Sequence, residues 1–97
     1  MKNFGGNRAY SIRYHPLVGN DLSKVDISIK EKIKKTIEEK LTTHPEVFGT
    51  PLRKSLKGYR SLRIGDYRAV FCLRGKIVFV LLFEHRSVVY KEILRRM

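Results

Sequence analysis

The sequence predicts an α+β fold in the order β-α-α-β-β-β, formed by one domain over residues 1–97. Two observations predict it. Apolar residues recur at every fourth position between residues 28 and 41, which is typical of a helix with one buried side. After residue 58, apolar and polar residues alternate in runs separated by tight-turn pairs, which is typical of consecutive strands. We expect two N-terminal helices to pack on one face of an antiparallel sheet, leaving the other face partly open.

The N-terminal half is expected to contain a strand and two helices after a loose arm at residues 1–7. Alternation over residues 9–14 predicts the strand. Apolar spacing predicts a short amphipathic helix near residues 16–25. Ser28 and Glu31 then form the capping-box pattern that begins a second, longer helix. One buried stripe is expected along this second helix, at Ile29, Ile33, Ile37 and Leu41.

The C-terminal half is expected to form a meander of strands. Residues 44–56 are expected to be a loop, because two prolines and a glycine interrupt any regular pattern. Strands are expected at residues 59–64, 67–74 and 77–83, joined by the turn pairs Gly65-Asp66 and Gly75-Lys76. The last strand is apolar on both faces, so we expect it to be central and covered on both sides. Residues 88–96 fit either a short strand or a short C-terminal helix.

The charge of the chain indicates a polyanionic or acidic partner. The formal net charge is +12, which is far from the ordinary balance of a small soluble domain. Residues 1–52 contribute +3 and residues 53–97 contribute +9, so the excess lies with the strand-rich half. The alternative is a solvated basic surface with no ligand.

Several classes of protein are excluded or disfavoured by the composition. Cys72 is the only cysteine, so no internal disulfide forms, and three dispersed histidines do not indicate a zinc site. We therefore expect no metal and no cofactor. The longest apolar run, residues 77–83, is too short to span a bilayer, and no signal peptide is visible. The expected location is the cytoplasm, without a membrane partner.

Cations, an imidazole and a phenol are concentrated on the last three expected strands and just beyond them. Arg63 and Arg68 flank the first tight turn, and strand alternation places Arg63 on the face opposite the expected core residues Leu62 and Ile64. The last strand is followed by His85, Arg86 and Tyr90. Cleavage of RNA by 2′-OH attack needs a base, an acid and cations that stabilise the charged pentacoordinate phosphorus, but no metal. This set of residues suits that chemistry.

Each of these residues also has a structural interpretation. Arg63 and Arg68 could be surface arginines paired with Asp66 or Glu84, and such exposed pairs contribute little. His85 could be a half-buried histidine bonded to a neighbour, and Tyr90 could be a core tyrosine. The basic cluster before the second strand could be a solvated loop; it comprises Arg53, Lys54, Lys57 and Arg60.

The block Gly65-Asp66-Tyr67-Arg68, followed by His85-Arg86 and Val89-Tyr90, closely resembles the RelE/ParE superfamily of toxins from type II toxin–antitoxin systems. The resemblance covers residues 8–95 and implies the fold of that superfamily. For the RelE branch it implies a ribosome-dependent, metal-independent endoribonuclease. Such a toxin enters the ribosomal A site, cuts the mRNA codon there to leave a 2′,3′-cyclic phosphate, and so inhibits translation.

The resemblance also implies roles for individual residues. Four positions match the catalytic places of the family: Arg63, Arg68, Arg86 and Tyr90. The hypothesis is that Arg63 and Arg68 hold the scissile phosphate, that Arg86 stabilises developing charge, and that Tyr90 orients or stacks on the substrate. Ser61 stands where the family has a basic residue, so His85 is expected to supply the proton transfer. The expected RNA contacts are Arg53, Lys54, Lys57, Arg60 and Ser61.

The alternative is the ParE branch, whose members inhibit DNA gyrase and catalyse no reaction. The presence of His85, Arg86 and Tyr90 favours the nuclease. For either branch the resemblance implies neutralisation by an acidic, RelB-like antitoxin, and for the nuclease it implies the ribosome and mRNA as partners. The expected antitoxin contacts are Lys30, Lys34, Lys35 and Arg95.

Overall fold

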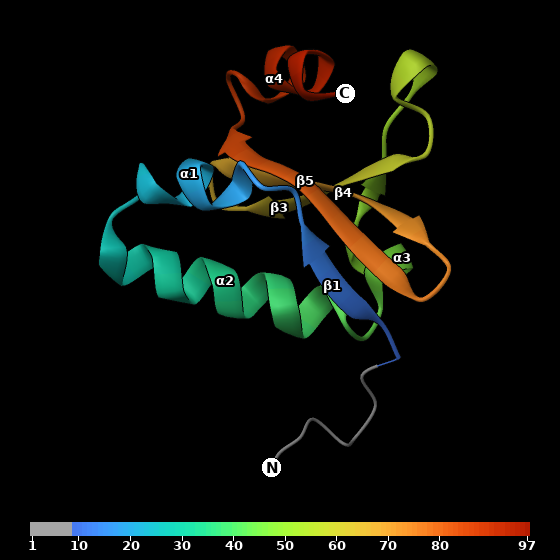
Figure 1. The fold of residues 1–97 in the computed structure, drawn as a ribbon, viewed down its shortest axis with the longest axis horizontal. Coiled ribbons are helices and arrows are strands. Elements are labelled where there is room, and N and C mark those ends of the chain that lie inside the picture. The colour runs from blue at the N-terminus through green and yellow to red at the C-terminus, as the bar shows by residue number, and fades with distance from the viewer. Residues whose placement is uncertain (1–8) are drawn as a thin grey trace.

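The computed structural model describes residues 9–97 and confirms the α+β class and the expected order of elements (Figure 1). The loose arm expected at residues 1–7 lies outside the described residues. The strands are β1 (Ser11–Tyr14), β2 (Thr50–Pro51), β3 (Tyr59–Ile64), β4 (Tyr67–Arg74) and β5 (Ile77–His85). The helices are α1 (Val18–Ser23), α2 (Ile27–Leu41), α3 (Pro45–Phe48), the 3-10 turn η2 (Lys54–Leu56) and α4 (Val89–Arg96). Within residues 9–97, no helix has the length and apolar composition needed to cross a membrane.

The five strands form one mixed sheet in the order β1-β5-β4-β3-β2. The expectation of an antiparallel sheet is correct for β2 to β5 but wrong for β1, which runs parallel to β5. The reason is the connection that follows β1. Its helices let the chain return to the sheet elsewhere, so the first and last strands can lie side by side in the same direction. The expected central position of β5 is confirmed, since it pairs with both β1 and β4.

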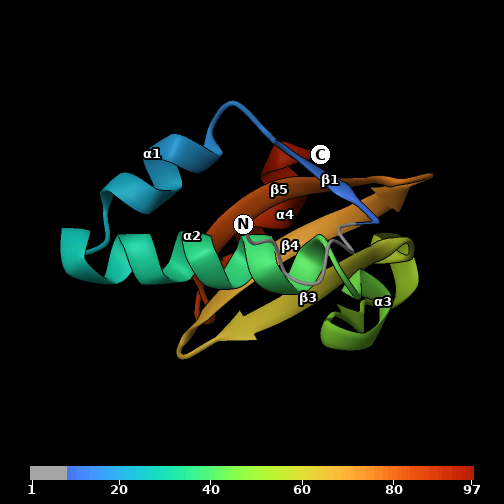
Figure 2. The same cartoon turned by 90° about the horizontal axis from the view of Figure 1, so that it is seen from below.

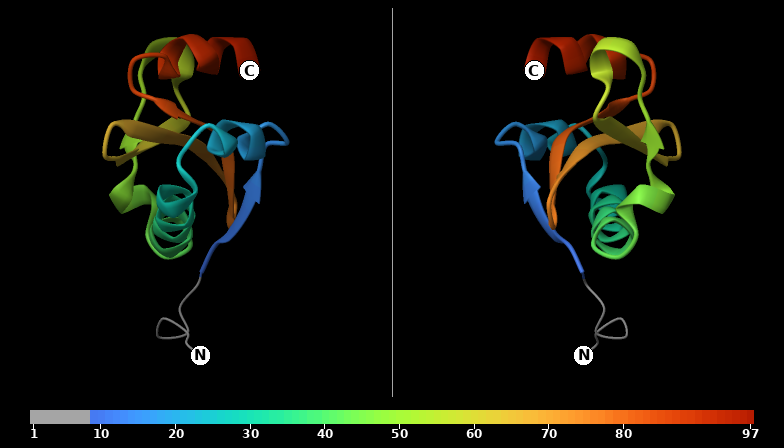
Figure 3. Two further views of the ribbon diagram at one scale, coloured as in Figure 1. Left: turned by 90° about the vertical axis from the view of Figure 1, so that its left-hand side faces the viewer. Right: turned by 90° about the vertical axis from the view of Figure 1, so that its right-hand side faces the viewer.

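Both faces of the sheet are partly covered, so the expected open face is narrower than the sequence suggests. Figure 2 shows α2 lying across one face, and Figure 3 shows α4 on the opposite side of the sheet. The first core joins α1 and α2 to strand residues that include Leu62, Ala69 and Phe83. The second core joins Val89 and Ile93 of α4 to strand residues that include Val70 and Leu82. The C-terminal segment is therefore a helix that buries part of the second face.

Helix α2 begins two residues earlier than the predicted capping box places it. Its N-cap is Asp26, whose side chain accepts a hydrogen bond from the Ser28 backbone N–H at 3.3 Å, so Ser28 lies inside the helix and the predicted capping box is wrong. Three residues of the predicted stripe are buried: Ile33, Ile37 and Leu41. Ile29 is 49% exposed, because the first turn of α2 lies over a shallow groove beside the β3–β4 turn.

The segment expected to be a loop, residues 44–56, contains α3, β2 and η2. The side chain of Arg60 fixes it, because Nη2 donates to the carbonyl oxygens of Glu46 at 2.7 Å and Gly49 at 2.9 Å, at the end of α3. Gly49 is required by close approach. A Cβ atom at this position would lie 2.8 Å from Cε1 of Phe71 and closer still to Cζ. These contacts set where β2 meets β3.

A bulge in β5 decides which side chains of this strand share a face. Phe71 pairs with Val80 and Val70 pairs with Leu82, so Leu81 has no partner of its own in β4. Val78 and Val80 point to the first core before the bulge, and Phe83 does so after it. The even positions therefore face α2 before the bulge and the odd positions face α2 after it.

Beyond Val80, no strand within residues 9–97 pairs with the outer side of β5, and the ion pair of Asp21 with Arg96 supplies hydrogen-bond partners to its backbone. The His15 backbone N–H donates to the Val80 carbonyl oxygen at 2.8 Å, where pairing with β1 ends. Farther along, the Phe83 N–H donates to Asp21 Oδ2 at 3.0 Å, and Arg96 Nη1 donates to the Leu81 carbonyl oxygen at 3.3 Å. Asp21 and Arg96 thus satisfy backbone groups that would otherwise be buried without partners.

We predict that Gly49→Ala destabilises the fold by about 1–3 kcal/mol, the usual cost of overpacking, because the added methyl group meets the Phe71 ring. Gly19→Ala is the matched control. Gly19 lies in α1 with open space around the Cβ position, so alanine there should be neutral or stabilising by up to about 1 kcal/mol. Urea unfolding of the two variants measures both effects, and equal stabilities would contradict the packing argument.

Candidate functional site

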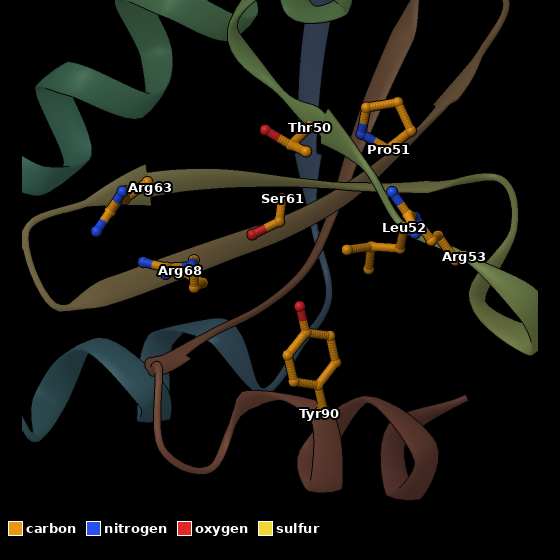
Figure 4. Close-up of a pocket in the computed structure, with 8 residues that line it drawn as sticks. All are labelled: Thr50, Pro51, Leu52, Arg53, Ser61, Arg63, Arg68 and Tyr90. Atoms are coloured by element: carbon orange, nitrogen blue, oxygen red, sulfur yellow. The ribbon is translucent and has the colours of Figure 1, made fainter.

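A groove of about 410 Å³ lies on the second face of the sheet, between the strands, the segment around β2 and helix α4 (Figure 4). The β2 segment contributes one wall and α4 contributes the facing wall through Tyr90. The strands β3 and β4 form the floor. The lining residues are Thr50, Pro51, Leu52, Arg53, Ser61, Arg63, Arg68 and Tyr90.

Strand register brings the floor residues together. Arg63 of β3 lies directly opposite Arg68 of β4, and Ser61 lies opposite Thr50 of β2. Residues directly opposite each other in a sheet project from the same face, and next-but-one residues on a strand do so too. Leu62 is buried on the other face. The expected placement of Arg63 on the face opposite Leu62 is therefore found in the structure, and Ser61 shares that face.

The two floor arginines have no carboxylate partner within residues 9–97. The ion pair formed by Asp66 is with Arg86, at 3.8 Å, so the alternative pairing of Arg63 or Arg68 with Asp66 is not found. Arg68 Nη1 makes only a long contact of 3.5 Å with the Tyr67 carbonyl oxygen. Like charges directly opposite in a sheet destabilise it. A bound anion would relieve this repulsion, which is why the pair suits a phosphate.

Tyr90 lies in the groove, not in the core. Its side chain is 57% exposed, whereas its neighbour Val89 is buried in the second core. Figure 4 shows the Tyr90 hydroxyl pointing from α4 toward the strands that carry Ser61 and Arg68. The phenol therefore faces the floor of the groove near Ser61, and the alternative of a core tyrosine is wrong.

His85 does not join this groove, contrary to the expectation that it serves the same site. It pairs with Tyr67 on the face that carries Phe83 and the first core. The rings of His85 and Tyr67 meet edge-on, with their centroids 5.5 Å apart. Nδ1 of His85 accepts a hydrogen bond from the Ser87 backbone N–H at 3.1 Å and lies 2.8 Å from Ser87 Oγ. The bulge at Leu81 is the physical reason. With unbroken alternation His85 would share the face of Arg68.

Four other predicted site residues lie outside the groove. Arg86 is exposed near the β3–β4 turn, where its N–H donates to the Asp66 carbonyl oxygen at 2.8 Å. Arg60 is directed into the segment at the end of α3, so its predicted RNA contact is replaced by a structural role. Lys54 and Lys57 stand at the two ends of η2, next to Arg53 but not lining the groove. Of the predicted basic cluster, Arg53 alone lines it.

The residues predicted for the antitoxin do not form one surface. Lys30 and Lys34 line a second groove of about 450 Å³ between α1 and α2, with an apolar floor that includes Val18 and Leu22. Lys35 is exposed on α2. Arg95 is on α4, across the sheet, where it pairs with Glu92 at 3.9 Å (Figure 1). Arg95 therefore lies on a different surface from the predicted lysine contacts.

Sequence reasoning missed the wall formed by Thr50, Pro51 and Leu52. A strand of two residues has no detectable period, and the hydrogen bond from the Leu52 N–H to the Tyr59 carbonyl oxygen at 2.9 Å leaves no mark on the sequence. The sequence gives Glu84 no role beyond that of a partner for an arginine or for His85. It lies opposite Arg68 in the sheet. Burial and the carboxylate of Asp21 raise its pKa, Lys24 lowers it, Glu92 raises it and Arg96 lowers it.

The groove can bind and polarise a phosphodiester. It offers the guanidinium groups of Arg53, Arg63 and Arg68, which remain charged and bind phosphate through two parallel hydrogen bonds. It also offers a phenol and two hydroxyls. Within residues 9–97 there is no group of three side chains placed to hold a metal ion. The chemistry available to the lining residues is therefore cationic and phenolic.

Comparison with known proteins identifies relatives of this architecture. The family model described as the ParE toxin of type II toxin–antitoxin systems matches residues 12–90. The toxin–antitoxin complex RelBE2 of Mycobacterium tuberculosis contains a chain that is 28% identical, with a TM-score of 0.73 over 80% of this chain and 99% of that one. A search of curated protein sequences finds no match.

Two further solved structures share the fold at lower identity. A mutant of the Escherichia coli toxin RelE in the free state is 24% identical, with a TM-score of 0.68 over 92% of this chain and 98% of that one. A chain of the chromosomal ParDE system of Pseudomonas aeruginosa is 16% identical, with a TM-score of 0.65 over 81% of this chain and 98% of that one. The fold is thus similar to structures from both branches of the superfamily.

We predict that Glu84→Gln stabilises the protein at pH 7. Because the folded-state pKa of Glu84 is raised, its ionised form costs stability, and that cost falls as the pH drops through the raised pKa. The advantage of the glutamine variant should therefore disappear below the ordinary glutamate pKa of 4.5. Thermal melting between pH 3.5 and 8 measures it, with the exposed Glu31→Gln as control. A Glu84→Gln variant that is less stable than the parent at pH 7 would contradict the assignment.

Proposed function

The chain belongs to the ParE-toxin family of type II toxin–antitoxin systems, and we propose that its toxic activity is metal-independent cleavage of mRNA in the ribosomal A site. Translation would stop because the message is cut. One observation carries the proposal. Arg53, Arg63 and Arg68 converge with Tyr90 on one groove, and no carboxylate is among the lining residues.

The cations of the groove suit the charge that develops during cleavage. The 2′ oxygen of the ribose attacks the adjacent phosphorus, the bond from phosphorus to the 5′ oxygen breaks, and a 2′,3′-cyclic phosphate remains. The pentacoordinate phosphorus carries more negative charge on its oxygens than the ground state does. Arg63 and Arg68 would hold these oxygens from the floor of the groove. Arg53 would hold a flanking phosphate from the β2 wall.

Proton transfer is divided in this proposal. Tyr90 directs its phenol toward the floor and would donate to the leaving 5′ oxygen or stack on a base. The lining residues include no side-chain carboxylate. They also include no imidazole, because His85 lies on the other face of the sheet. A base for the 2′ proton would then come from outside this groove. This incomplete set of groups supports a requirement for the ribosome, where other groups surround the message.

The second candidate function is inhibition of DNA gyrase without catalysis. It is favoured by the family model, which is that of the ParE toxin, and by the absence of His85 from the groove. The two candidates differ in their targets. Induced expression with primer extension on a reporter mRNA detects cuts within codons. A gyrase supercoiling assay with the purified protein detects the alternative.

We predict that Arg68→Ala lowers cleavage by about 10²–10³-fold, the usual effect of removing one contact to a charged transition state. The variant should keep its melting temperature or gain slightly, because a like-charge repulsion with Arg63 is lost. Primer extension on the reporter mRNA measures the cuts. Arg13→Ala, on the edge strand β1, removes the same charge far from the groove and should leave cleavage unchanged. A folded Arg68→Ala protein that cleaves as well as the parent would contradict the assignment of Arg68 to phosphate binding.

The proposed partner is a cognate acidic antitoxin. Solved relatives include the toxin–antitoxin complexes RelBE2 of M. tuberculosis and RelB–RelE of Methanococcus jannaschii. In this chain the groove between α1 and α2 combines an apolar floor with Lys30 and Lys34 at its rim. An amphipathic segment with acidic residues beside its apolar ones complements such a groove.

We predict that Lys34→Glu weakens binding of the antitoxin by tenfold or more, because like charges would then meet across the interface. Lys76→Glu, in the turn between β4 and β5, makes the same charge change away from the α1–α2 groove. Isothermal titration calorimetry with the purified antitoxin compares the two. Equal losses of affinity would indicate that net charge alone controls binding and would contradict a docking site at this groove.

A further inference from the structure

Helix α4 carries two stripes of side chains with different surroundings. Val89, Ile93 and Arg96 lie at positions i, i+4 and i+7, and all three side chains are largely removed from solvent. One residue farther along, Tyr90, Leu94 and Met97 form an exposed stripe. An isolated helix of eight residues is marginal in water, so its position depends on how the first stripe docks.

The apolar contacts of α4 only weakly fix its rotation about its own axis. Val89 and Ile93 are one turn apart and pack against Val70, Leu81 and Leu82. Apolar contacts are non-directional, so two of them on one stripe hold the helix down but resist rolling about its axis only weakly. Rolling would move Tyr90 along the groove or out of it.

Arg96 supplies the directional contact. Its Nη1 and Nη2 donate to Asp21 Oδ2 at 2.7 Å and to Oδ1 at 3.1 Å, a two-pronged pair whose side chains are 5% and 1% exposed. Nη2 also donates to Glu92 Oε2 at 2.8 Å, and Nη1 reaches the Leu81 carbonyl oxygen. A planar guanidinium facing a carboxylate in this way permits one orientation, and burial makes any other costly.

We propose that Asp21 and Arg96 are positioning residues that fix the roll of α4 and thereby direct the Tyr90 phenol at the floor of the groove. The inference rests on the proposed nuclease function and adds a role for a pair on the far side of α4 from the groove. Asp21 is itself held, because the Phe83 N–H donates to it at 3.0 Å. The position of Tyr90 is therefore set relative to the backbone of β5, and β5 pairs with β4, which forms part of the groove floor.

A double-mutant cycle separates positioning from general destabilisation. Arg96→Gln is made in the parent and in a Tyr90→Ala background, and cleavage is measured with binding of a non-cleavable RNA. In the parent we expect kcat to fall tenfold or more while the Kd for RNA changes less than twofold, since Arg53, Arg63 and Arg68 remain. In the Tyr90→Ala background we expect a loss below twofold, because there is no phenol left to misplace.

The exposed Lys91→Gln removes the same charge from the same helix and should leave kcat unchanged in both backgrounds. Equal losses from Arg96→Gln with and without the Tyr90 phenol would overturn the proposal, because they would show a role independent of Tyr90. If Arg96→Gln does not fold, Arg96→Lys keeps the charge and one hydrogen bond, and the same cycle applies to it with the same two outcomes.

A readout without RNA keeps this inference distinct from the proposed function. If the parent cuts no RNA, the nuclease proposal fails, and the roll of α4 is tested by NMR of the tyrosine rings. Tyr90 signals are assigned with Tyr90→Phe. We expect the Arg96 variant to shift or broaden the Tyr90 ring signals while those of Tyr10, which packs against the first core, stay in place. Unchanged Tyr90 signals in a folded variant would overturn the positioning role.

Discussion

The fold depends on how the outer side of β5 is completed after β1 ends. A backbone edge buried between α1 and α4 must find partners, and one ion pair supplies them: Asp21 takes the Phe83 N–H and Arg96 reaches the Leu81 carbonyl oxygen. The same pair joins a helix near the start of the described chain to one at its end. Burying two charges is costly, and the cost is offset here by the two-pronged contact with Asp21 and by the further hydrogen bonds of Arg96 to Glu92 and to the Leu81 carbonyl oxygen. The consequence is that α1 and β5 are tied to α4, the helix that carries Tyr90 into the groove.

The groove is built from features that each work against stability. Arg63 and Arg68 repel each other across β3 and β4, and Tyr90 leaves much of a large ring in water. A domain with other means of stabilisation tolerates such costs where they serve ligand binding. The two cores and the close packing of Gly49 against Phe71 supply that stability. We infer that the arrangement is maintained for an anionic ligand.

The sequence was sufficient for the parts of the fold that have a local period. The four-residue spacing of α2 predicted three of its buried residues, and the alternation of β3 placed Arg63 correctly on the face opposite Leu62. It was insufficient where a single extra residue in a strand, or one contact between distant parts of the chain, determines the structure. The bulge at Leu81 reverses the faces of β5 and removes His85 from the groove. The contact between Asp21 and Arg96 joins residues 75 positions apart, and neither has a motif around it. The two-residue strand β2 is too short for any pattern to reveal.

We propose that RNA binds in the groove of Arg53, Arg63, Arg68 and Tyr90. NMR titration with a short RNA whose attacking 2′-OH is replaced by hydrogen is the decisive experiment, because this ligand binds without being cut. We expect the largest amide shifts on residues 50–53, on the facing part of β3 and β4, and on the first turn of α4. Shifts centred on α2 and His85, across the sheet, would contradict it.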